Sequence, residues 1–231
     1  MKKLCIIPAR GGSKRLPNKN IIKLHNKPLV FYTIDACLKS KIFDKIIFTS
    51  DNQEIIDLVE QNYNEKILET HIRPESLATD TSKVIDTVLH YLDESFNQTW
   101  LSLPTAPLKN HIDFQKVDKI LSDKIKSVIS YTEMEFPPSL GLVVNEQGYI
   151  SDSHESKPWV NGNSRSQDHP IIYRPNGAIY ASWTDELRKN KNFYTDNTKG
   201  YFMKREDSID IDNLIDFQFV EFLMKTKRTI E

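Results

Sequence analysis

Residues 6–20 read IIPARGGSKRLPNKN, and this stretch decides how the start of the chain folds. Its first residues belong to the apolar run 3–8, which predicts a buried strand, and two adjacent glycines follow it closely. Glycine tolerates positive φ and leaves backbone N–H groups unshielded, so such a loop can wrap an anion. Within ten residues the loop also carries four cations, namely Arg10, Lys14, Arg15 and Lys19.

This basic loop favours a ligand with several negative charges over an ordinary solvated turn. A nucleoside triphosphate carries about four negative charges, and hydrogen bonds from Lys and Arg to phosphate are about twice as strong as neutral ones. The loop after the first strand of an α/β sheet is also where such ligands dock. The residue order matches neither a Walker A loop nor the GxGxxG pattern, so the loop predicts a triphosphate site of another kind.

Strand-like and helix-like segments alternate from this loop to residue 131. Pro28 suits the first turn of a helix that ends near Ser40. A second helix can be capped by Ser50 or Asp51, and a later helix can be capped by Asn110. Further helical spacing covers 81–95, and the predicted strands cover 3–8, 45–49, 66–68, 100–103 and 127–131. This alternation predicts right-handed βαβ units and a mostly parallel sheet in an α/β fold.

The alternation stops after residue 132. Residues 133–175 contain five of the eleven prolines and three of the seven glycines, and Gly148 predicts the turn of a hairpin. About forty irregular residues inside a compact domain would be unusual, so we expect an arm that packs on another surface. Strand-like runs resume at 177–182 and 208–212, before a final helix. We therefore divide the chain into an α/β domain, residues 1–132 and 176–231, and an arm, residues 133–175.

The overall composition argues against several classes of protein. The chain has 231 residues and a net charge of -1, whereas a general nucleic-acid binder should be basic. No apolar stretch reaches 18 residues, which argues against a membrane span. The two cysteines, Cys5 and Cys37, lie in apolar or amphipathic runs and are expected to be buried thiols. We expect a cytoplasmic protein that binds neither nucleic acid nor membrane.

Six motifs follow one another along the chain: IIPARGGSKRLPNKN (6–20), TSD (49–51), RPESLATDTS (73–82), LPTAPL (103–108), RPNGAIY (174–180) and DSIDID (207–212). In order and spacing they resemble the nonulosonic acid cytidylyltransferases, which include the CMP-sialic acid (acylneuraminate) synthetases. The resemblance covers almost the whole chain, and the first and the last two motifs are the specific ones. It implies a three-layer, Rossmann-like nucleotidyltransferase fold with a swapped arm that forms a homodimer.

The resemblance also implies a reaction, in which CTP and a nonulosonic (sialic-type) acid give a CMP-sugar and pyrophosphate. Such a reaction needs no covalent intermediate, so catalysis would consist of positioning and charge neutralisation. The implied catalytic residues are Arg10, Lys19, Asp210 and Asp212. The implied CTP-binding residues are Arg10, Gly11, Gly12, Ser13, Lys14, Lys19, Asn20, Arg73, Asp80 and Ser82.

Asp210 and Asp212 are the expected metal ligands. Their i, i+2 spacing on a predicted strand would place both carboxylates on one face. Mg²⁺ prefers one or two carboxylates together with phosphate oxygens and water, and the family places its divalent ion, Mg²⁺ or Mn²⁺, on this pair. The alternative is that Asp212 caps the final helix and Asp210 is a solvated residue at a strand end, although a cap role for Asp212 is compatible with metal binding. Asp207 and Asp216 are expected to be surface charges in either case.

The sugar acid brings a carboxylate, which a planar guanidinium can grip with two parallel bonds. The resemblance assigns this role to Arg174 in RPNGAIY and to Arg165 in NSRSQD. Four further residues could wall the sugar pocket, although packing in the core or in a dimer interface is an equal alternative for them: Gln167, Tyr180, Phe193 and Tyr194.

One position departs from the family string. The family carries glutamine in LLQPTSPLR, whereas this chain reads LSLPTAPLK, with Leu103 at that position and Lys109 in place of arginine. Leucine cannot hydrogen-bond a sugar hydroxyl, so a pocket that contains Leu103 should prefer a methyl or deoxy carbon. This favours 9-deoxy acids such as legionaminic or pseudaminic acid, unless Leu103 is an ordinary core residue at a strand end.

Two other functions stay open. A CMP-Kdo-type synthetase would share the IPAR opening but lack RPNGAIY followed by SIDID. A non-catalytic relative could bind nucleotide or sugar as a sensor, although the charged residues at positions 10, 19, 210 and 212 argue against it.

Overall fold

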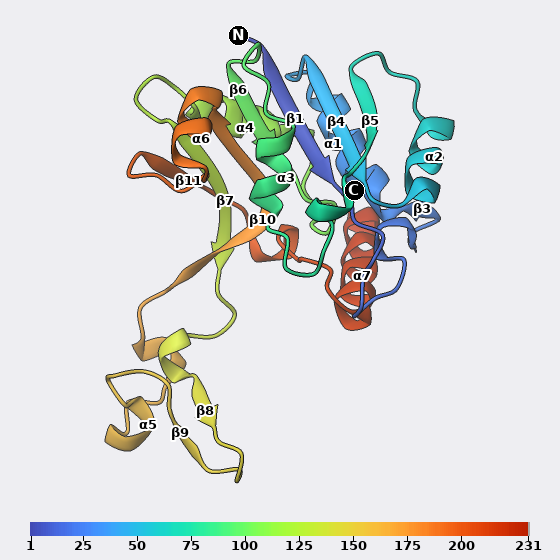
Figure 1. The fold of residues 1–231 in the computed structure, drawn as a ribbon. Helices are drawn as coiled ribbons and strands as arrows, with labels where there is room; N and C mark the ends of the chain where they lie inside the picture. The colour runs from blue at the N-terminus through green and yellow to red at the C-terminus, as the bar shows by residue number, and fades with distance from the viewer. Residues whose placement is uncertain (231) are drawn as a thin grey trace.

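The computed structural model describes residues 1–230 and shows a seven-stranded sheet with helices on both faces (Figure 1). The strand order is β11-β7-β10-β6-β1-β4-β5. The strands of this sheet are β1 (Lys3–Pro8), β4 (Lys45–Ser50), β5 (Leu68–Ile72), β6 (Gln98–Leu101), β7 (Ser127–Glu133), β10 (Tyr173–Trp183) and β11 (Thr198–Phe202). Two short ribbons pair β2 (Lys23–Leu24) with β3 (Lys27–Pro28) and β8 (Leu142–Val144) with β9 (Ile150–Asp152).

The described residues form seven α-helices, and five of them make up the outer two layers. The seven helices are α1 (Leu29–Ser40), α2 (Gln53–Asn62), α3 (Val84–His90), α4 (His111–Ile120), α5 (Pro158–Asn161), α6 (Thr184–Asn190) and α7 (Leu214–Ile230). Helices α1, α2 and α4 share one hydrophobic cluster with one face of the sheet, and α3 and α6 share a second cluster with the other face. The predicted three-layer α/β architecture is therefore confirmed.

Strand β1 shows why the sheet needs helices on both faces. Its side chains alternate, so that Cys5 and Ile7 join the α1 cluster while Leu4 and Ile6 join the α3 cluster. All four are fully buried, as expected for a central strand of a parallel sheet. The Sγ atoms of Cys5 and Cys37 lie 3.7 Å apart as free, buried thiols, in agreement with the prediction.

The sheet is mostly parallel, as predicted. Strand β1 pairs in parallel with β4 and β6, and β7 pairs in parallel with β11, whereas β10 runs antiparallel to both of its neighbours. Strand β11 was not predicted, because this edge strand is half exposed and its sequence TKGYF lacks an apolar run.

Several helix and strand boundaries in the structure differ from those predicted. The helix predicted over 81–95 ends at His90, because the chain then turns around Asp93, whose Oδ1 accepts from the N–H of Ser95 at 2.8 Å. The strand predicted at 66–68 lies at 68–72. Asn52, and neither Ser50 nor Asp51, caps α2 by accepting from the N–H of Glu54. Asn110 caps α4 with a complete capping box, as predicted.

The segment 208–212 is not a strand, which corrects the prediction made for SIDID. It follows a short 3₁₀ turn and runs beside the loop after β6, where the N–H of Ile211 donates to the carbonyl oxygen of Thr105 at 2.8 Å. Strand alternation therefore does not set the directions of Asp210 and Asp212. Instead Ile211 is buried in a third hydrophobic cluster, which joins α7 to the loop after β1.

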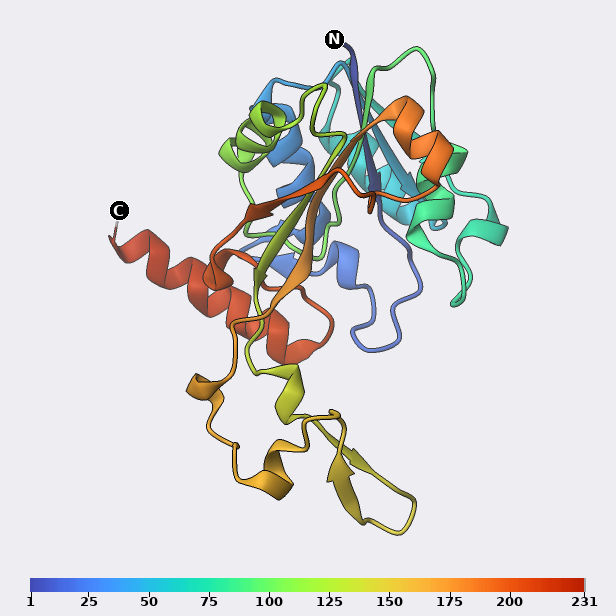
Figure 2. The ribbon, with the colours of Figure 1, turned by 90° about the vertical axis from the view of Figure 1, so that its left-hand side faces the viewer.

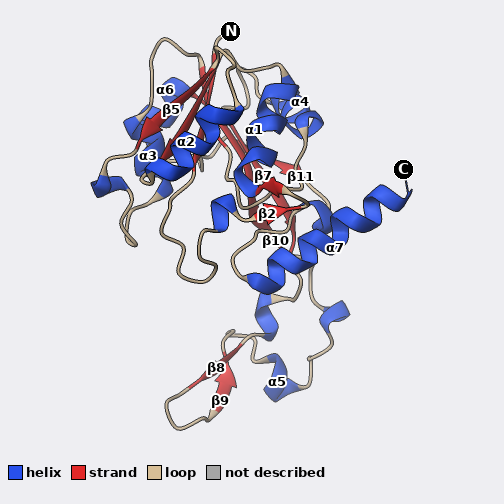
Figure 3. Ribbon diagram, turned by 90° about the vertical axis from the view of Figure 1, so that its right-hand side faces the viewer, coloured by secondary structure: helices blue, strands red, loops and turns tan. Residues whose placement is uncertain are grey.

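The final helix α7 lies on the side of the sheet from which the segment between β7 and β10 projects (Figure 3). Its cap is Asn213, whose Oδ1 accepts from Ile215 and Asp216, while Asp216 accepts in return from the N–H of Asn213 at 3.0 Å. The interpretation of Asp212 as the cap, and of Asp216 as a simple surface charge, was therefore wrong. Over the part of the chain that the structure describes, no helix has the length and hydropathy needed to cross a bilayer.

The segment between β7 and β10 comprises residues 134–172, slightly fewer than the predicted 133–175, and it projects from the rest of the chain (Figure 2). From here on, residues 134–172 are called the arm and the rest of the chain is called the body. The arm carries the predicted hairpin, β8–β9, whose turn contains Gly148 at φ +84°. The strands at its root pair with each other, since Tyr173 lies opposite Glu133 and the N–H of Met134 donates to the carbonyl oxygen of Ile172.

Candidate active site

The candidate site lies where the order of the strands reverses. After β1 the chain builds β4 and β5 on one side of β1 and then returns to form β6 on its other side. In an open α/β sheet, ligands bind outside the carboxyl ends of the strands at such a reversal. Pro8 at the end of β1 and Leu103 just after β6 both line two neighbouring clefts at this point.

The first of these, the basic cleft, has a volume of about 350 Å³ and collects most of the predicted phosphate-binding residues. It is lined by Pro8, Arg10, Ser13, Lys14, Arg15, Lys19, Asn20, Leu103, Pro104, Thr105 and Asp212. Lys19 is 12% exposed, and its Nζ donates to the carbonyl oxygen of Ile211 at 2.8 Å and to Asp212 Oδ1 at 3.1 Å. The loop after β1 is thereby tied to the segment before α7.

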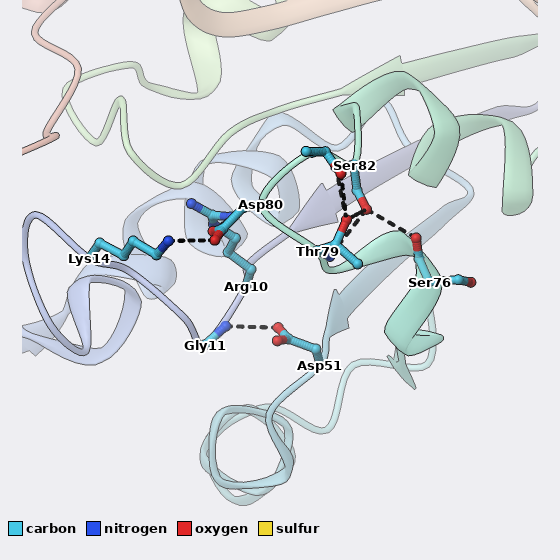
Figure 4. A network of polar contacts seen from close by, with 9 residues as sticks. Arg10, Gly11, Lys14, Asp51, Ser76, Thr79, Asp80 and Ser82 are labelled. Carbon is cyan, nitrogen blue, oxygen red and sulfur yellow. Dashed lines mark hydrogen bonds and ion pairs between the residues drawn. The ribbon is translucent and has the colours of Figure 1, made fainter.

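The two adjacent glycines have different surroundings. The N–H of Gly11 donates to Asp51 Oδ1 at 2.8 Å, so in this structure it does not point into an open anion cradle (Figure 4). A β-carbon on Gly11 would lie 2.7 Å from the β-carbon of Asn52, which explains the need for glycine, whereas Gly12 faces open space. Asp51 comes from the TSD motif, and this contact gives the motif a structural role that the sequence did not indicate.

Asp80 faces the cations of the basic cleft from the adjacent cleft, which has a volume of about 290 Å³ (Figure 4). Its carboxylate accepts from Lys14 Nζ at 2.6 Å and from Arg10 Nη1 at 3.4 Å. The hydrogen bond from Lys14, assisted by Arg10, holds the pKa of Asp80 below its ordinary value. A carboxylate thus neutralises two of the predicted phosphate ligands.

Ser82 holds the loop that carries Asp80. Its hydroxyl accepts from the N–H of Thr79 at 3.1 Å and donates to the carbonyl oxygen of Ser76 at 3.0 Å. Ser82, one of the implied CTP-binding residues, also lines the adjacent cleft and shapes its wall.

Asn20 and Arg73 are both buried and bind backbone. Asn20 Nδ2 donates to the carbonyl oxygen of Arg10 at 2.7 Å, and Arg73 Nη2 donates to that of Thr49 at 2.8 Å. Burial lowers the pKa of Arg73, and the nearby charge of Asp51 opposes that shift. Asn20 Oδ1 and Arg73 Nε are buried without a hydrogen-bond partner within residues 1–230, so both retain polar capacity for a ligand.

The two predicted metal ligands differ in their contacts. Asp210 Oδ1 is buried and finds no hydrogen-bond partner among the described residues, whereas Asp212 is paired with Lys19 and with Arg15 Nη2 at 2.8 Å. No group of three or more acidic, His or Cys residues that could hold a metal occurs in the described chain. An unpartnered buried carboxylate oxygen fits a hard cation that takes its other ligands from phosphate and water.

Leu103 lies at the junction of the two clefts and not in the core alone. It is half-buried, and a β-carbon at Gly177 would lie 3.5 Å from Leu103 Cδ1 and 3.9 Å from Asp210 Oδ2. Gly177 has φ +73°, which glycine adopts without strain. This close approach of the β10 backbone brings Leu103 and Asp210 to one place.

The three aromatic residues of the predicted sugar pocket divide between core and surface. Phe193 is buried in the cluster that also contains Leu4, and its ring centroid lies 5.6 Å from that of Tyr180. Burial raises the pKa of Tyr180 to about 12, with smaller contributions from Tyr194 and Asp210, which therefore lie near it. Tyr194 is 53% exposed, so Tyr180 and Tyr194 can contact a ligand while Phe193 supports them.

The predicted sugar-binding arginines lie in or beside the arm. Arg165 is largely exposed, its guanidinium lies within hydrogen-bonding distance of the Gln167 side-chain amide, and its Nε lies 3.7 Å from Asp168 Oδ2. Neither Arg165 nor Gln167 lines the basic or adjacent cleft of its own chain. Arg174 at the start of β10 forms a two-pronged contact with Glu135, whose pKa this contact lowers. Glu135 stands in none of the six motifs and was not predicted to contact a site residue.

Asn176 and Lys109 are two buried polar residues that the sequence did not single out as functional. Asn176, in RPNGAIY, donates to Ser208 Oγ at 2.9 Å and thus fastens the segment before Asp210 to β10. Lys109 lies under the loop after β6, where its ammonium is fully hydrogen-bonded. The motif RPNG pointed toward the first of these contacts, but no periodicity pointed toward the second.

Comparison with known proteins agrees with this geometry. The cytidylyltransferase family model matches residues 4–156, and the chain therefore belongs to the cytidylyltransferase family. It is 37% identical over 226 residues to an N-acylneuraminate cytidylyltransferase of Streptococcus agalactiae serotype V, covering 94% of this chain and 52% of that protein. The chain thus spans about half the length of this relative.

A second relative matches this chain over nearly the full length of both proteins. The CMP-N,N'-diacetyllegionaminic acid synthase of Legionella pneumophila is 34% identical over 235 residues, with 97% of both chains covered. Among solved structures, CMP:2-keto-3-deoxy-manno-octonic acid synthetase in complex with CTP superposes with a TM-score of 0.71 at 16% identity, over 98% of this chain and all of that one. This structural likeness confirms the nucleotidyltransferase fold.

Proposed function

We propose that this chain transfers a cytidylyl group from CTP to a nonulosonic acid of the sialic type. The observation that carries the proposal is the basic cleft, which gathers Arg10, Lys14 and Lys19 beside Asp212 at the reversal point of the sheet. In the reaction the anomeric hydroxyl of the acid attacks the α-phosphorus of CTP. One P–O bond forms while the hydroxyl loses its proton to a nearby carboxylate or to water, the bond between the α-phosphorus and the oxygen of the β-phosphate breaks, and pyrophosphate leaves.

The cations of the cleft would hold the triphosphate and stabilise the charge that develops on pyrophosphate. Lys19 is held in place by Ile211 and Asp212, so it would meet the phosphates without reorganising. Lys14 and Arg10 are engaged by Asp80, whose carboxylate the triphosphate would replace. The base would then lie in the adjacent cleft, against Arg73 and the loop held by Ser82.

Asp210 and Asp212 would hold Mg²⁺ or Mn²⁺ together with phosphate oxygens. A bound divalent ion neutralises phosphate charge and lowers the pKa of a coordinated hydroxyl. The proposal is supported by the buried, unpartnered oxygen of Asp210, among the residues described, and by the hard-oxygen preference of these ions.

The sugar acid would lie between Leu103, Tyr180 and Tyr194. A hydroxyl buried against leucine without a partner costs about 1–3 kcal/mol, whereas a methyl group there is favourable. We therefore propose a 9-deoxy acid such as legionaminic or pseudaminic acid, with acylneuraminate as a poorer substrate. The similarity to a legionaminic acid synthase along the full length supports this choice.

A pyrophosphate-release assay tests the reaction. CTP should support turnover with acylneuraminate, legionaminic or pseudaminic acid and not with Kdo, and UTP should be poorer by up to about 10⁴-fold, because its carbonyl replaces the amino donor of cytosine. Asp210→Asn should abolish turnover, while Asp185→Asn, at the start of α6, should not. Turnover with Kdo alone would establish a CMP-Kdo-type synthetase, and nucleotide binding without turnover a sensor.

We also propose a homodimer formed through the arm. Ten large apolar side chains of the arm are 40–79% exposed: Phe136, Leu142, Val143, Val144, Tyr149, Ile150, Trp159, Val160, Ile171 and Ile172. Surfaces of this kind mark interaction sites, and a second copy would place Arg165 and Gln167 near the partner's clefts. Light scattering should give twice the mass of the chain, and a stable, active monomer would contradict the proposal.

A cytoplasmic location belongs to the same proposal. It is supported by the two free, buried cysteines, which are typical of reducing compartments. Fractionation of cells that express the protein would test it.

A further inference from the structure

Lys109 is a buried charged side chain that the proposed chemistry does not use. It follows the loop after β6 and immediately precedes the cap of α4, and the residue is 3% exposed. Its Nζ donates to Leu103 O at 2.7 Å, to Ala106 O at 2.8 Å and to Thr33 Oγ1 on α1 at 2.8 Å. An ammonium has three protons, so each of its donors has an acceptor.

Burial of the Lys109 ammonium costs desolvation free energy, whereas burial of an apolar side chain in the same space would not. Replacing a buried charge by an apolar side chain of similar volume is often neutral or stabilising, provided that no partner is left charged. Here the acceptors are neutral: two carbonyl groups and a hydroxyl group. Two of the three hydrogen bonds bind the backbone of one short loop, residues 103–106, to the interior.

That loop is in contact with both halves of the candidate site. Leu103 lines the basic and the adjacent cleft and lies beside Gly177. Thr105 lines the basic cleft, and its carbonyl oxygen accepts the N–H of Ile211, between the two predicted metal ligands. A shift of the loop would therefore move Leu103 and the 210–212 segment together.

We propose that Lys109 is a positioning residue of the proposed cytidylyltransferase reaction, which fixes the 103–106 loop and through it both Leu103 and the segment with Asp210 and Asp212. It contacts neither cleft and is not catalytic. The expected effect of Lys109 on turnover rests on the proposed function. The hydrogen bond from the N–H of Ile211 to Thr105 allows the positioning role to be tested without substrate, by amide hydrogen exchange at Ile211.

The test replaces Lys109 by Met, which keeps the length of the side chain and removes its three donors. Lys109→Met should lower kcat by about 10- to 100-fold, because an error of about 1 Å in positioning can cost that much, while the KM for CTP changes little. Amide hydrogen exchange at Ile211 should become about tenfold faster. Lys109→Arg keeps the charge and several donors, and should recover part of both properties.

Lys3→Met is the matched control. Lys3 is also a part-buried lysine, paired with Asp118 Oδ2 at 2.7 Å, but it begins β1 at the end of the strand opposite Pro8. This variant should change neither kcat nor exchange at Ile211. If Lys109→Met does not fold, Thr33→Val removes one acceptor and should lower kcat by a few fold, with Thr33→Ser restoring it.

Four outcomes decide between the role of Lys109, its refutation and a failure of the proposed function. Loss of kcat with faster exchange at Ile211 in Lys109→Met, and not in Lys3→Met, supports the proposal. Wild-type kcat and exchange in folded Lys109→Met overturn it, as does an equal loss of kcat in Lys3→Met. A wild-type chain without turnover on any acid refutes the proposed function, whereas the exchange measurement still decides whether Lys109 fixes the segment.

Discussion

The body and the arm of this chain differ in how much of their apolar side chains they bury. Every member of the three hydrophobic clusters in the described structure belongs to the body, where strands such as β1 bury side chains on both faces of the sheet. In the arm, Val143, Ile150 and Val160 are 54%, 67% and 79% exposed. The arm is nevertheless held at its root by pairing between β7 and β10.

This difference in burial suggests that the body and the arm are stabilised in different ways. The body buries enough apolar surface to fold by itself, and the candidate clefts lie within it. The arm has a backbone scaffold but contributes to none of the three hydrophobic clusters of residues 1–230, and it buries Leu140 while its other large apolar side chains are mostly exposed, so its stability should depend on what covers it. We therefore expect changes in the body to affect chemistry or folding, and changes in the arm to affect assembly and the sugar site.

Excision of the arm should have the largest effect. Replacing residues 135–171 by Asn-Gly would join Met134 and Ile172, which are already hydrogen-bonded, through a two-residue hairpin turn. The body should still unfold cooperatively, but the chain should be monomeric and its kcat/KM for the sugar acid should fall by about 10³-fold, because Arg165 and Gln167 are removed. Light scattering and the pyrophosphate assay test this. A shortened chain with full activity would contradict the role of the arm.

Lys19→Ala should have the next largest effect, confined to the body. It removes a cation held at the centre of the basic cleft, so kcat should fall by about 10²- to 10³-fold. Because Lys19 is only 12% exposed and its loss leaves the carbonyl oxygen of Ile211 without its partner, the free energy of unfolding should also fall, by about 1–3 kcal/mol. Lys14→Ala, at an 80% exposed side chain, should leave stability unchanged. Unaltered kinetics in Lys19→Ala would refute its assignment to phosphate.

Alkaline pH should stabilise the body through Lys109. Burial lowers the pKa of Lys109 to about 8, against an ordinary value of 10.5 in the unfolded chain. Between these values the unfolded state binds the proton and the folded state does not, so the free energy of unfolding rises with pH, by up to about 3 kcal/mol from this group. Urea unfolding of the wild type should therefore gain stability relative to Lys109→Met from pH 8 to 10. A difference that is constant over this range would show that the lysine stays charged.

The adjacent glycines offer a smaller, matched test in the body. Gly11→Ala should destabilise the chain by about 1–3 kcal/mol, because its β-carbon would collide with Asn52. It should also weaken CTP binding, since the hydrogen bond to Asp51 would be displaced. Gly12→Ala faces open space and should stay within about 0.5 kcal/mol of wild type. Equal effects in thermal melts would mean that this loop adapts more than its contacts suggest.

Leu103→Gln should have the smallest effect and concerns the boundary between the body and the sugar. Gain of a hydrogen-bonding group should shift the ratio of kcat/KM values toward N-acetylneuraminate by about 10- to 100-fold, with the KM for CTP nearly unchanged. Comparison of N-acetylneuraminate with legionaminic acid measures this. A lower melting temperature with uniformly slower turnover would instead identify Leu103 as a packing residue.

The sequence predicted the body well where the structure depends on local patterns. Short apolar runs identified most strands of the sheet, and Asn110 identified the start of α4. The edge strand β11 was not predicted, because its sequence is largely polar. The segment SIDID was wrongly predicted to be a strand, because Ile211 is buried by contact with α7 and not by strand pairing. Lys19 and Asp212 are 193 positions apart, so no periodicity could bring them together. That association came from the resemblance, whereas the contacts of Asp51, Lys109 and Glu135 needed the three-dimensional structure.

The pairing at the root of the arm has a consequence for how such chains can change. Since β7 and β10 are fastened side by side, residues 134–172 close a loop whose ends the sheet already holds together. The entropy of closing a flexible loop grows only with the logarithm of its length, at about 0.6 kcal/mol for each doubling. The length and sequence of this insertion are thus almost decoupled from the folding of the sheet. A graft that exchanges the whole insertion for that of a relative would inherit a preformed pair of anchor strands, so we expect it to alter partner choice without disturbing the body.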